Sequence, residues 1–387
     1  MFSAAPKVSA GLPLQPFFAS PEQRAALARE RFFEQGERPT GLISEAVLQS
    51  WSRCRSARRN PGWGLAFDPV SRSRLHATLE QNRALLLAAG DEISRLESAL
   101  AGTASRVLLT DRNGVIVHAT GAEAGGDGAS PGVLTRVARR GVSLAEDVVG
   151  TNAPAVVLKT GEAVTVLGSE HYFDCVQSLR CAAAPIHDGQ GRLAGVLDLT
   201  VEARPFAFDA AALVGVYATV IENRLLQAQA HEHLVLAFQV CPTMLGTPLQ
   251  ALVGVDSQGR VAWRNGVAHK LLGLAGGDAP PAEAVLGLPL AALLSRSAGD
   301  APLTLRLPNG LSVWAQARLH SHDAPRGTHP SAAAPVAPAT TTAPTLDALA
   351  RDAIERTVAD CGGNLSAAAR RLGVSRGLLY RRRRTAT

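Results

Sequence analysis

The chain has 387 residues, of which 46% are hydrophobic and 19% charged, so it is long enough for two or three globular domains and too apolar for a disordered chain. Its net charge of +6 is concentrated near the C-terminal end, where residues 351–387 carry nine arginines and three acidic side chains. A basic module beside a neutral body is typical of nucleic-acid binding, although a solvated basic tail has the same composition.

The composition argues against a membrane protein, a secreted chain and a structural metal site. The longest uncharged apolar stretch, Ala210 to Ile221, is too short to cross a bilayer. The first twenty residues are interrupted by three prolines and lack the apolar core of a secretory signal. Five scattered cysteines without a C-x-x-C pair argue against a disulfide framework and a zinc site. We therefore expect a cytoplasmic protein with no membrane partner, no metal and no cofactor.

Predicted helices recur along the body of the chain. Residues 1–74 are expected to form an N-terminal helical segment with an amphipathic helix at Leu42–Arg59. The four arginines of that helix are interpreted as a solvated face, with contact to acidic partners as the alternative. Further helices are predicted at Leu75–Leu100, Asn152–Lys159, Asp209–Gln229 and Val267–Leu274, the last with Asn265 as its cap.

Three β-hairpins alternate with these helices, at Arg106–Ala119, Ala182–Thr200 and Ala251–Asn265. Each joins two apolar strands through a D-x-x-G turn, in which the aspartate caps its own backbone and the glycine accepts a positive φ. Short helices packed on antiparallel hairpins predict an α+β sandwich with one exposed sheet face available for a ligand.

The segment Ser321–Thr345 separates this body from the C-terminal end of the chain. It contains five prolines, seven alanines and five threonines, so it cannot bury enough apolar surface to order itself. We interpret residues 321–345 as an extended linker.

The remaining residues, 346–387, predict an all-α domain of three helices. Glycines 362 and 363 end the first helix, Asn364 caps the second, and Gly373 makes the turn to the third. A small residue at Ala369 followed by that glycine is the spacing of a helix-turn-helix, whose last helix enters the major groove of DNA. The alternative is a three-helix bundle with a basic end. The expected DNA contacts are Asn364, Ser366, Ser375, Arg376, Gly377, Leu378, Tyr380, Arg381 and Arg382.

These residues also carry a resemblance to a known family. Asn364–Arg376 with Leu379–Arg381 resembles the Fis-type helix-turn-helix of bacterial regulators. The body resembles the GAF sensor of acetoin-catabolism-type, sigma-54-dependent regulators, at Glu146–Ala153, Glu170–Phe173, Cys181–Ile186 and Gly195–Leu199. A second part is similar to a PAS module, at Leu252–Leu274 and Leu303–Leu319. The resemblance implies a GAF-like domain at 75–230 and a PAS-like domain at 231–320.

The chain departs from that family at two places. Such regulators carry an AAA+ ATPase domain between sensor and helix-turn-helix, with a G-x-x-x-x-G-K-[ST] loop for nucleotide phosphates. The three lysines (Lys7, Lys159 and Lys270) lie outside any such loop, and a 25-residue linker is too short for the domain. We therefore expect no ATPase activity. Gly377 and Leu378 replace a polar pair in the recognition helix, so the family's base preference cannot be transferred.

GAF and PAS folds hold small molecules between sheet and helices, so the resemblance implies a ligand pocket. Its candidate residues by motif position are His171, Tyr172, Phe173, Cys175 and Cys181. A histidine beside aromatic residues is more often a satisfied core residue than a ligand contact. Cys175 and Cys181 form a candidate redox pair, although buried cysteines usually behave as small hydrophobic residues.

These observations predict a transcription regulator that is not an enzyme. The expected partners are double-stranded DNA, a small-molecule effector, a second copy of the chain, and RNA polymerase or a related regulator. The helix Asp209–Gln229 is the expected dimerisation element, because paired half-sites match palindromic operators. Two alternatives stay open: a Fis-like architectural DNA-binding protein with a vestigial sensor, and a GAF-fold thiol reductase that uses Cys181.

Overall fold

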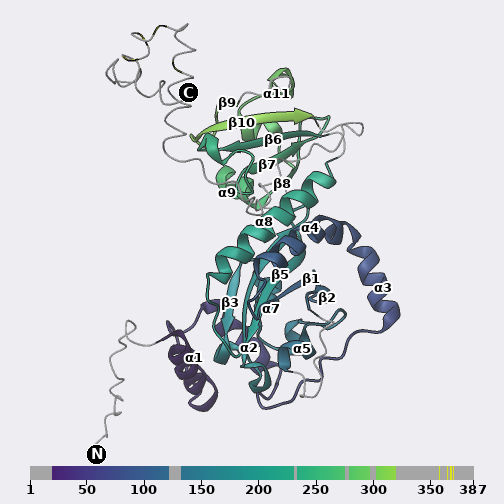
Figure 1. Ribbon diagram of the computed structural model, residues 1–387, viewed down its shortest axis with the longest axis vertical. Helices are drawn as coiled ribbons and strands as arrows, with labels where there is room; N and C mark the ends of the chain where they lie inside the picture. The colour runs from purple at the N-terminus through teal and green to yellow at the C-terminus, as the bar shows by residue number, and fades with distance from the viewer. Residues whose placement is uncertain are drawn as a thin grey trace, which may run out of the picture. The chain divides into compact units, whose positions relative to one another are not determined.

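The computed structural model describes residues 20–121, 132–230, 233–274, 279–296 and 302–319, together with positions 357, 364, 367 and 369. Its contacts divide the chain into two units, Met1–Pro325 and Arg326–Thr387. The first unit contains two five-stranded antiparallel sheets with helices packed on them, as Figure 1 shows. The α+β prediction for the body of the chain is confirmed.

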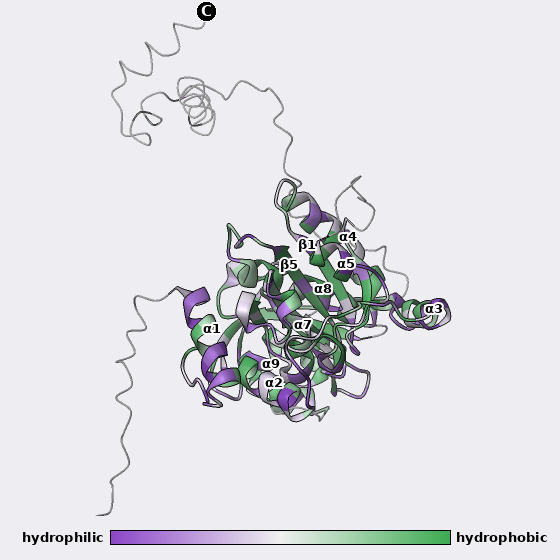
Figure 2. Ribbon diagram, turned by 90° about the horizontal axis from the view of Figure 1, so that it is seen from below, coloured by the Kyte–Doolittle hydropathy of each residue, from purple (hydrophilic) through white to green (hydrophobic). Residues whose placement is uncertain are grey.

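The first sheet has the strand order β2-β1-β5-β4-β3. Its strands are β1 (Arg106–Asp111), β2 (Ile116–Ala119), β3 (Val164–Leu167), β4 (Leu179–His187) and β5 (Leu193–Glu202). The central strand β5 pairs with β1 on one side and with β4 on the other. Figure 2 shows β1 and β5 coloured largely hydrophobic, whereas α1 (Pro21–Arg29) and α3 (Arg72–Gln81) carry many hydrophilic residues.

Helices cover both faces of this sheet, so the expected exposed face is wrong here. Val107 and Leu109 of β1 join one buried cluster, and Leu108 between them joins another, because successive side chains of a strand point to opposite faces. The first cluster includes residues of α4 (Arg83–Ala99) and α8 (Ala210–Ala228). The second includes residues of α2 (Glu45–Ser56), α5 (Val133–Val137), α6 (Glu146–Val149) and α7 (Ala153–Thr160). The N-terminal part begins with α1 and a π-helical turn, Glu30–Glu34.

The single helix predicted over Leu75–Leu100 is wrong, because the structure divides it into α3 and α4. The break lies at Asn82, whose φ of −101° and ψ of 16° end one helix and begin the next. The Asn82 side chain donates back to the Thr78 carbonyl at 2.8 Å, a local hydrogen bond that competes with helix continuation.

The second sheet has the order β8-β7-β6-β10-β9. Its strands are β6 (Leu234–Gln239), β7 (Ala251–Val255), β8 (Val261–Arg264), β9 (Leu303–Arg306) and β10 (Ser312–Leu319). Three helices pack on one face, α9 (Gly266–Leu272), α10 (Ala282–Leu286) and α11 (Leu290–Arg296). On the opposite face, Trp263 and Leu252 pack with Leu226 from the end of α8.

All three predicted D-x-x-G turns are confirmed. At the first turn, Asp111 Oδ1 accepts from the amides of Asn113 and Val115 at 2.9 and 2.8 Å, and Gly114 has a φ of +83°. Asp188 and Asp256 cap the other two turns in the same way. These turns depend on residues only two to four positions apart, so the local sequence suffices to predict them.

Few residues of the predicted helix-turn-helix are described. Asn364 Oδ1 accepts from the amide of Ala367 at 3.2 Å, as its predicted role of N-cap requires. Ala369 is buried, which agrees with its expected place at a close helix crossing. The other expected DNA contacts lie outside the described residues: Ser366, Ser375, Arg376, Gly377, Leu378, Tyr380, Arg381 and Arg382.

Across the described segments, every helix is too short or too polar to cross a membrane.

Candidate functional site: a polar cavity against the first sheet

A small cavity lies between the first sheet and the residues that cover the sheet on the side of α7. These covering residues come from residues 137–154 and 171–176. The volume of the cavity is about 20 Å³, which holds about one water molecule. Most of its lining is apolar, and five side chains that can hydrogen-bond interrupt that lining, from the start of α7, the turn before β4, β4 and β5. The lining residues are Leu108, Val137, Leu144, Val149, Asn152, Pro154, His171, Val176, Leu179, Cys181, Asp198 and Thr200.

The alternation of β5 places Asp198 and Thr200 on the same face of the sheet. Thr200 lies opposite Cys181 of β4, and Asp198 lies opposite Leu108 of β1 and Ala183 of β4. Both polar side chains are almost completely buried, with 1% of Asp198 and 2% of Thr200 exposed. A carboxyl group in such a place needs a compensating partner, because burial without a hydrogen bond is costly.

Hydrogen-bonding groups form a row along the cavity wall. His171 Nδ1 lies 3.0 Å from the Gly168 carbonyl oxygen, which only accepts, so Nδ1 carries the proton and Nε2 is an acceptor. Nε2 stands 3.5 Å from Cys181 Sγ. The Thr200 hydroxyl stands 3.2 Å from the same sulfur and donates to Asp198 Oδ2 at 2.6 Å. The row therefore runs from His171 through Cys181 and Thr200 to Asp198.

Burial sets the protonation of this row. It lowers the pKa of His171 to about 4, against a weaker raising effect of the Gly168 carbonyl. It raises the pKa of Asp198 to about 7, although the Thr200 hydroxyl opposes the shift. The pKa of the Cys181 thiol is also raised, first by burial and then by Asp198. At neutral pH the imidazole and thiol are uncharged and the carboxyl is partly protonated.

Asp198 has an unfilled hydrogen-bonding position. Its Oδ1 is buried and has no hydrogen-bond partner among the residues that the structure describes. Buried polar atoms in folded proteins nearly always have a partner, which is protein, water or ligand. Because the atom lines a cavity that holds about one water molecule, the missing partner is expected to be a molecule inside that cavity, either water or a ligand.

Two of the five predicted pocket residues, His171 and Cys181, meet in this cavity. The other three pack outside its lining. The Tyr172 hydroxyl donates to the Arg59 carbonyl at 2.7 Å, the Arg59 guanidinium lies 4.9 Å from the centre of the Phe173 ring, and Cys175 is partly exposed beside the Trp63 carbonyl. Cys175 and Cys181 are both free thiols.

Asp198, Thr200 and Asn152 were not among the pocket residues predicted from the sequence. The signal for the first two was a carboxylate and a hydroxyl two positions apart inside the apolar strand β5. Asn152 begins α7, where its Oδ1 accepts from the Ala155 amide at 3.0 Å and its Nδ2 donates to two carbonyls. Its side chain is thus satisfied by the protein. In the described segments no group of His, Cys, Asp and Glu side chains has the geometry to hold a metal ion.

Strand β4 leads from Cys181 to a buried junction at its end. There Glu222 of α8 accepts from the amide and ring nitrogen of His187, both at 2.9 Å. The other oxygen of Glu222 accepts from the Gly266 amide, at the first turn of α9, at 2.7 Å. The neighbouring Asn223 accepts from Asn265 Nδ2 at 2.7 Å. The cavity wall and the second sheet's first helix therefore contact the same turn of α8.

Two family models match this chain. The family described as MimR, N-terminal domain, matches residues 21–222. The family described as bacterial regulatory protein, Fis family, matches residues 345–385. The first match contains the whole of the cavity lining, and the second contains all the expected DNA contacts.

Several curated proteins are similar to this chain. The acetoin catabolism regulatory protein of Cupriavidus necator is 30% identical over 252 residues, which cover 64% of this chain and 37% of that protein. The propane 2-monooxygenase operon transcriptional activator MimR of Mycolicibacterium goodii is 33% identical over 187 residues, 47% of this chain and 30% of that protein. The chain thus spans about a third of the length of these relatives. Among solved structures, the Escherichia coli DhaR(N)-DhaL complex aligns with a TM-score of 0.43 at 16% identity, over 72% of this chain and 99% of that one.

Proposed function

Because this chain belongs to the family of the MimR N-terminal domain and ends in a helix-turn-helix of the Fis family, we propose that it is a DNA-binding transcription regulator controlled by a small molecule. The similar proteins carry names of transcriptional regulators and activators, which supports a regulatory rather than a catalytic role. The proposed parts are an N-terminal helical segment (1–74), two sensor domains (75–230 and 231–320), a linker (321–345) and the DNA-binding domain (346–387).

The proposed effector site is the cavity at Asp198, and the unpartnered Oδ1 of that residue carries the proposal. Among the described residues no lysine or arginine lines the cavity, and its carboxyl group is partly protonated at neutral pH. Such a site favours a small uncharged molecule with a hydroxyl or carbonyl group over an anion. The names of the relatives refer to acetoin catabolism and to a propane 2-monooxygenase operon, and acetoin and propane are both small, uncharged molecules.

The proposed DNA contacts lie in the second and third helices predicted for residues 346–387. They are the nine residues between Asn364 and Arg382 that the helix-turn-helix motif indicates. A homodimer in the cytoplasm, bound to a two-fold operator, fits this kind of module. RNA polymerase or a related regulator is the proposed protein partner. The sequence contains no G-x-x-x-x-G-K-[ST] loop, so any ATPase activity needed for transcription would come from that partner.

Recovery of genomic DNA fragments on the purified 387-residue chain tests both parts of the proposal. We expect selective recovery of a few fragments, with an affinity that changes when acetoin is added as the probe. Asp198→Asn is expected to keep DNA binding and lose the response, whereas the exposed Asp68→Asn keeps both. Equal recovery of random and genomic fragments would instead favour the architectural alternative, and an unaltered response in Asp198→Asn would exclude the cavity as the effector site.

The geometry does not favour a thiol reductase. A reactive thiol needs a low pKa and access to solvent, whereas Cys181 is buried and its pKa is raised. Of the candidate redox pair, Cys175 is the partly exposed thiol, and it contacts the Trp63 carbonyl rather than Cys181.

A further inference from the structure

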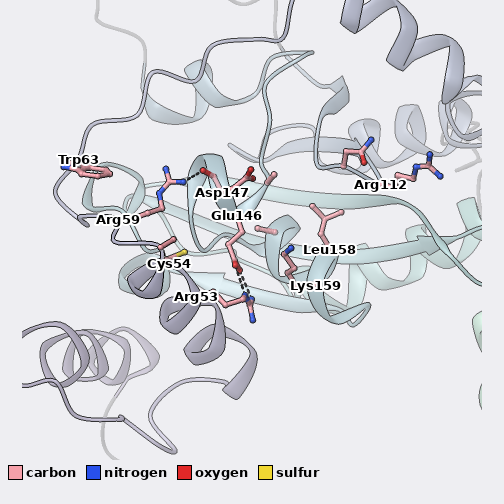
Figure 3. A pocket seen from close by; sticks show the side chains of 13 residues that line it. Arg53, Cys54, Arg59, Trp63, Arg112, Glu146, Asp147, Leu158 and Lys159 are labelled. Atoms are coloured by element: carbon pink, nitrogen blue, oxygen red, sulfur yellow. Dashed lines mark hydrogen bonds and ion pairs between the residues drawn. The ribbon is translucent and has the colours of Figure 1, made fainter.

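A second and much larger cavity lies between α2 with the loop after it on one side and α6, α7 and the β1–β2 turn on the other, outside the proposed effector site. It is an open cleft of about 800 Å³, within the range of small-molecule sites. Figure 3 shows Trp63 and Arg112 at opposite ends of the cleft, with Glu146 and Lys159 between them. The lining residues are Arg53, Cys54, Ala57, Arg59, Trp63, Arg112, Asn113, Ala145, Glu146, Asp147, Ala155, Leu158 and Lys159.

The ion pair between Arg53 and Glu146 lies in the wall of the cleft, and the two charges of this pair cancel. Arg53 donates from Nε and Nη2 to the two oxygens of Glu146, both at 2.7 Å, and the Ser50 hydroxyl donates to Glu146 at 2.6 Å. Burial opposes ionisation of Glu146, but these hydrogen bonds and the charges of Arg53 and Lys159 lower its pKa. Glu146 is therefore ionised and fully occupied, and the interpretation of Arg53 as part of a solvated face is wrong.

The other three cations of the cleft lack carboxylate partners. The Arg59 guanidinium donates to the backbone carbonyls of Asp147 and Val148, and its buried Nε has no partner among the described residues. In the same part of the chain, Arg112 and Lys159 form no salt bridge. Against these three positive charges stands one further acid, the exposed Asp147. The cleft thus has a net positive charge.

The cleft also offers apolar surface beside this charge. Leu158 and Ala57 contribute to its lining, and Trp63 at one end is 53% exposed. A large exposed aromatic ring beside cationic groups is typical of binding surfaces rather than of solvated ones.

We propose that this cleft binds a small organic anion, in which a carboxylate or phosphate group meets Arg112 and Lys159, and an apolar body lies on the Ala57 and Leu158 surface. Arginine and lysine side chains are the usual partners of both groups. The cleft is thereby opposite in chemistry to the cavity at Asp198, which has no cationic side chain in its described lining. The chain then has two ligand sites, one for an uncharged molecule and one for an anion.

Calorimetric titration of the 387-residue chain with three probes that share an aromatic ring tests the proposal. The probes are benzoate, phenyl phosphate and uncharged benzyl alcohol, at matched ionic strength. We expect at least one anion to bind at least about tenfold more tightly than benzyl alcohol, since a charge-assisted hydrogen bond contributes that much or more. The tighter anion identifies carboxylate or phosphate as the natural group. Equal binding of all three probes, or no binding of either anion, overturns the proposal.

Variants locate the site. The double variant Arg112→Gln with Lys159→Gln is expected to weaken anion binding by about tenfold or more, with an unchanged thermal midpoint. Arg74→Gln, which removes an exposed arginine of α3 that does not line the cleft, is expected to leave binding unchanged. Loss of binding in Arg74→Gln as well, or retention in the double variant, would assign the effect to net charge or to another place.

Discussion

Glu222 and His187 are joined by two hydrogen bonds to one carboxylate oxygen, from the backbone amide and the ring nitrogen of the histidine, each at 2.9 Å. The second oxygen of Glu222 accepts from the Gly266 amide, and only 5% of the residue is exposed. One buried carboxylate therefore joins the end of β4, which contributes to the wall of the proposed effector cavity, to the first turn of α9.

Glu222→Gln is expected to lower the free energy of unfolding by about 1–3 kcal/mol, because an amide group offers one acceptor oxygen where three donors need two. Urea unfolding followed by circular dichroism measures the change. Glu80→Gln on exposed α3 serves as the matched control and is expected to change stability by less than about 0.5 kcal/mol. Equal effects of the two variants would contradict a special role of the junction.

Titration of the Asp198 carboxyl group is expected to lower the free energy of unfolding of the native chain as pH rises from about 4 to about 7. The pKa of this group is raised from 3.8 to about 7 in the folded chain, so in this window the folded state binds a proton that the unfolded state has released, and stability falls with pH. Asp198→Asn removes this dependence. The difference between the two unfolding free energies, measured at several pH values, is expected to shift in favour of the variant by a few kcal/mol over that window. A flat difference would show that the carboxyl titrates normally.

His171 predicts the opposite trend between about pH 4 and 6.5. Its pKa is lowered from 6.5 to about 4 by burial, so in this window the unfolded chain binds a proton that the folded chain does not, and stability rises with pH. His171→Gln removes that contribution, and the advantage of the native chain over the variant is expected to grow as pH rises through the window. A native advantage independent of pH would contradict the neutral, buried imidazole.

A single methyl group added at Gly150 is expected to lower the free energy of unfolding substantially. The φ of Gly150 is +68°, and a Cβ there would lie 2.9 Å from a ring carbon of Phe173, so Gly150→Ala is expected to cost about 1–3 kcal/mol. Gly90→Ala, in the middle of α4 with open space around it, is expected to stabilise by about 0.5–1 kcal/mol through helix propensity. Thermal unfolding of the pair checks both signs, and destabilisation of similar size in both would point to a general intolerance instead.

Arg381 carries the prediction for DNA binding. Arg381→Ala is expected to weaken binding to the recovered fragments and to reduce the slope of log K against log salt by about one unit, because one phosphate contact is lost. Electrophoretic mobility shifts at several salt concentrations measure the slope. An unchanged slope would remove Arg381 from the interface.

The local sequence predicted the parts of this structure that depend on neighbouring residues. The turn at Asp111 and the cap at Asn265, whose Oδ1 accepts from the Ala268 amide, need only residues two to four positions away. Asp198 was not selected because its burial arises from segments far away in sequence, and a carboxyl group in a strand is ordinarily a solvated one. The same distance effect explains why the covered second face of the sheet was missed, since α2 lies about fifty residues before β1.

The cavity volume of about 20 Å³ has a kinetic consequence. Any effector larger than a water molecule enters only after the residues that cover the cavity, in 137–154 and 171–176, have moved. The rate of association is then set by the opening of the protein rather than by diffusion. The observed rate then reaches a plateau as effector concentration increases, and the plateau equals the opening rate. A regulator of this kind responds to its effector on the time scale of the reciprocal of the opening rate, and it does not respond to concentration changes that are shorter.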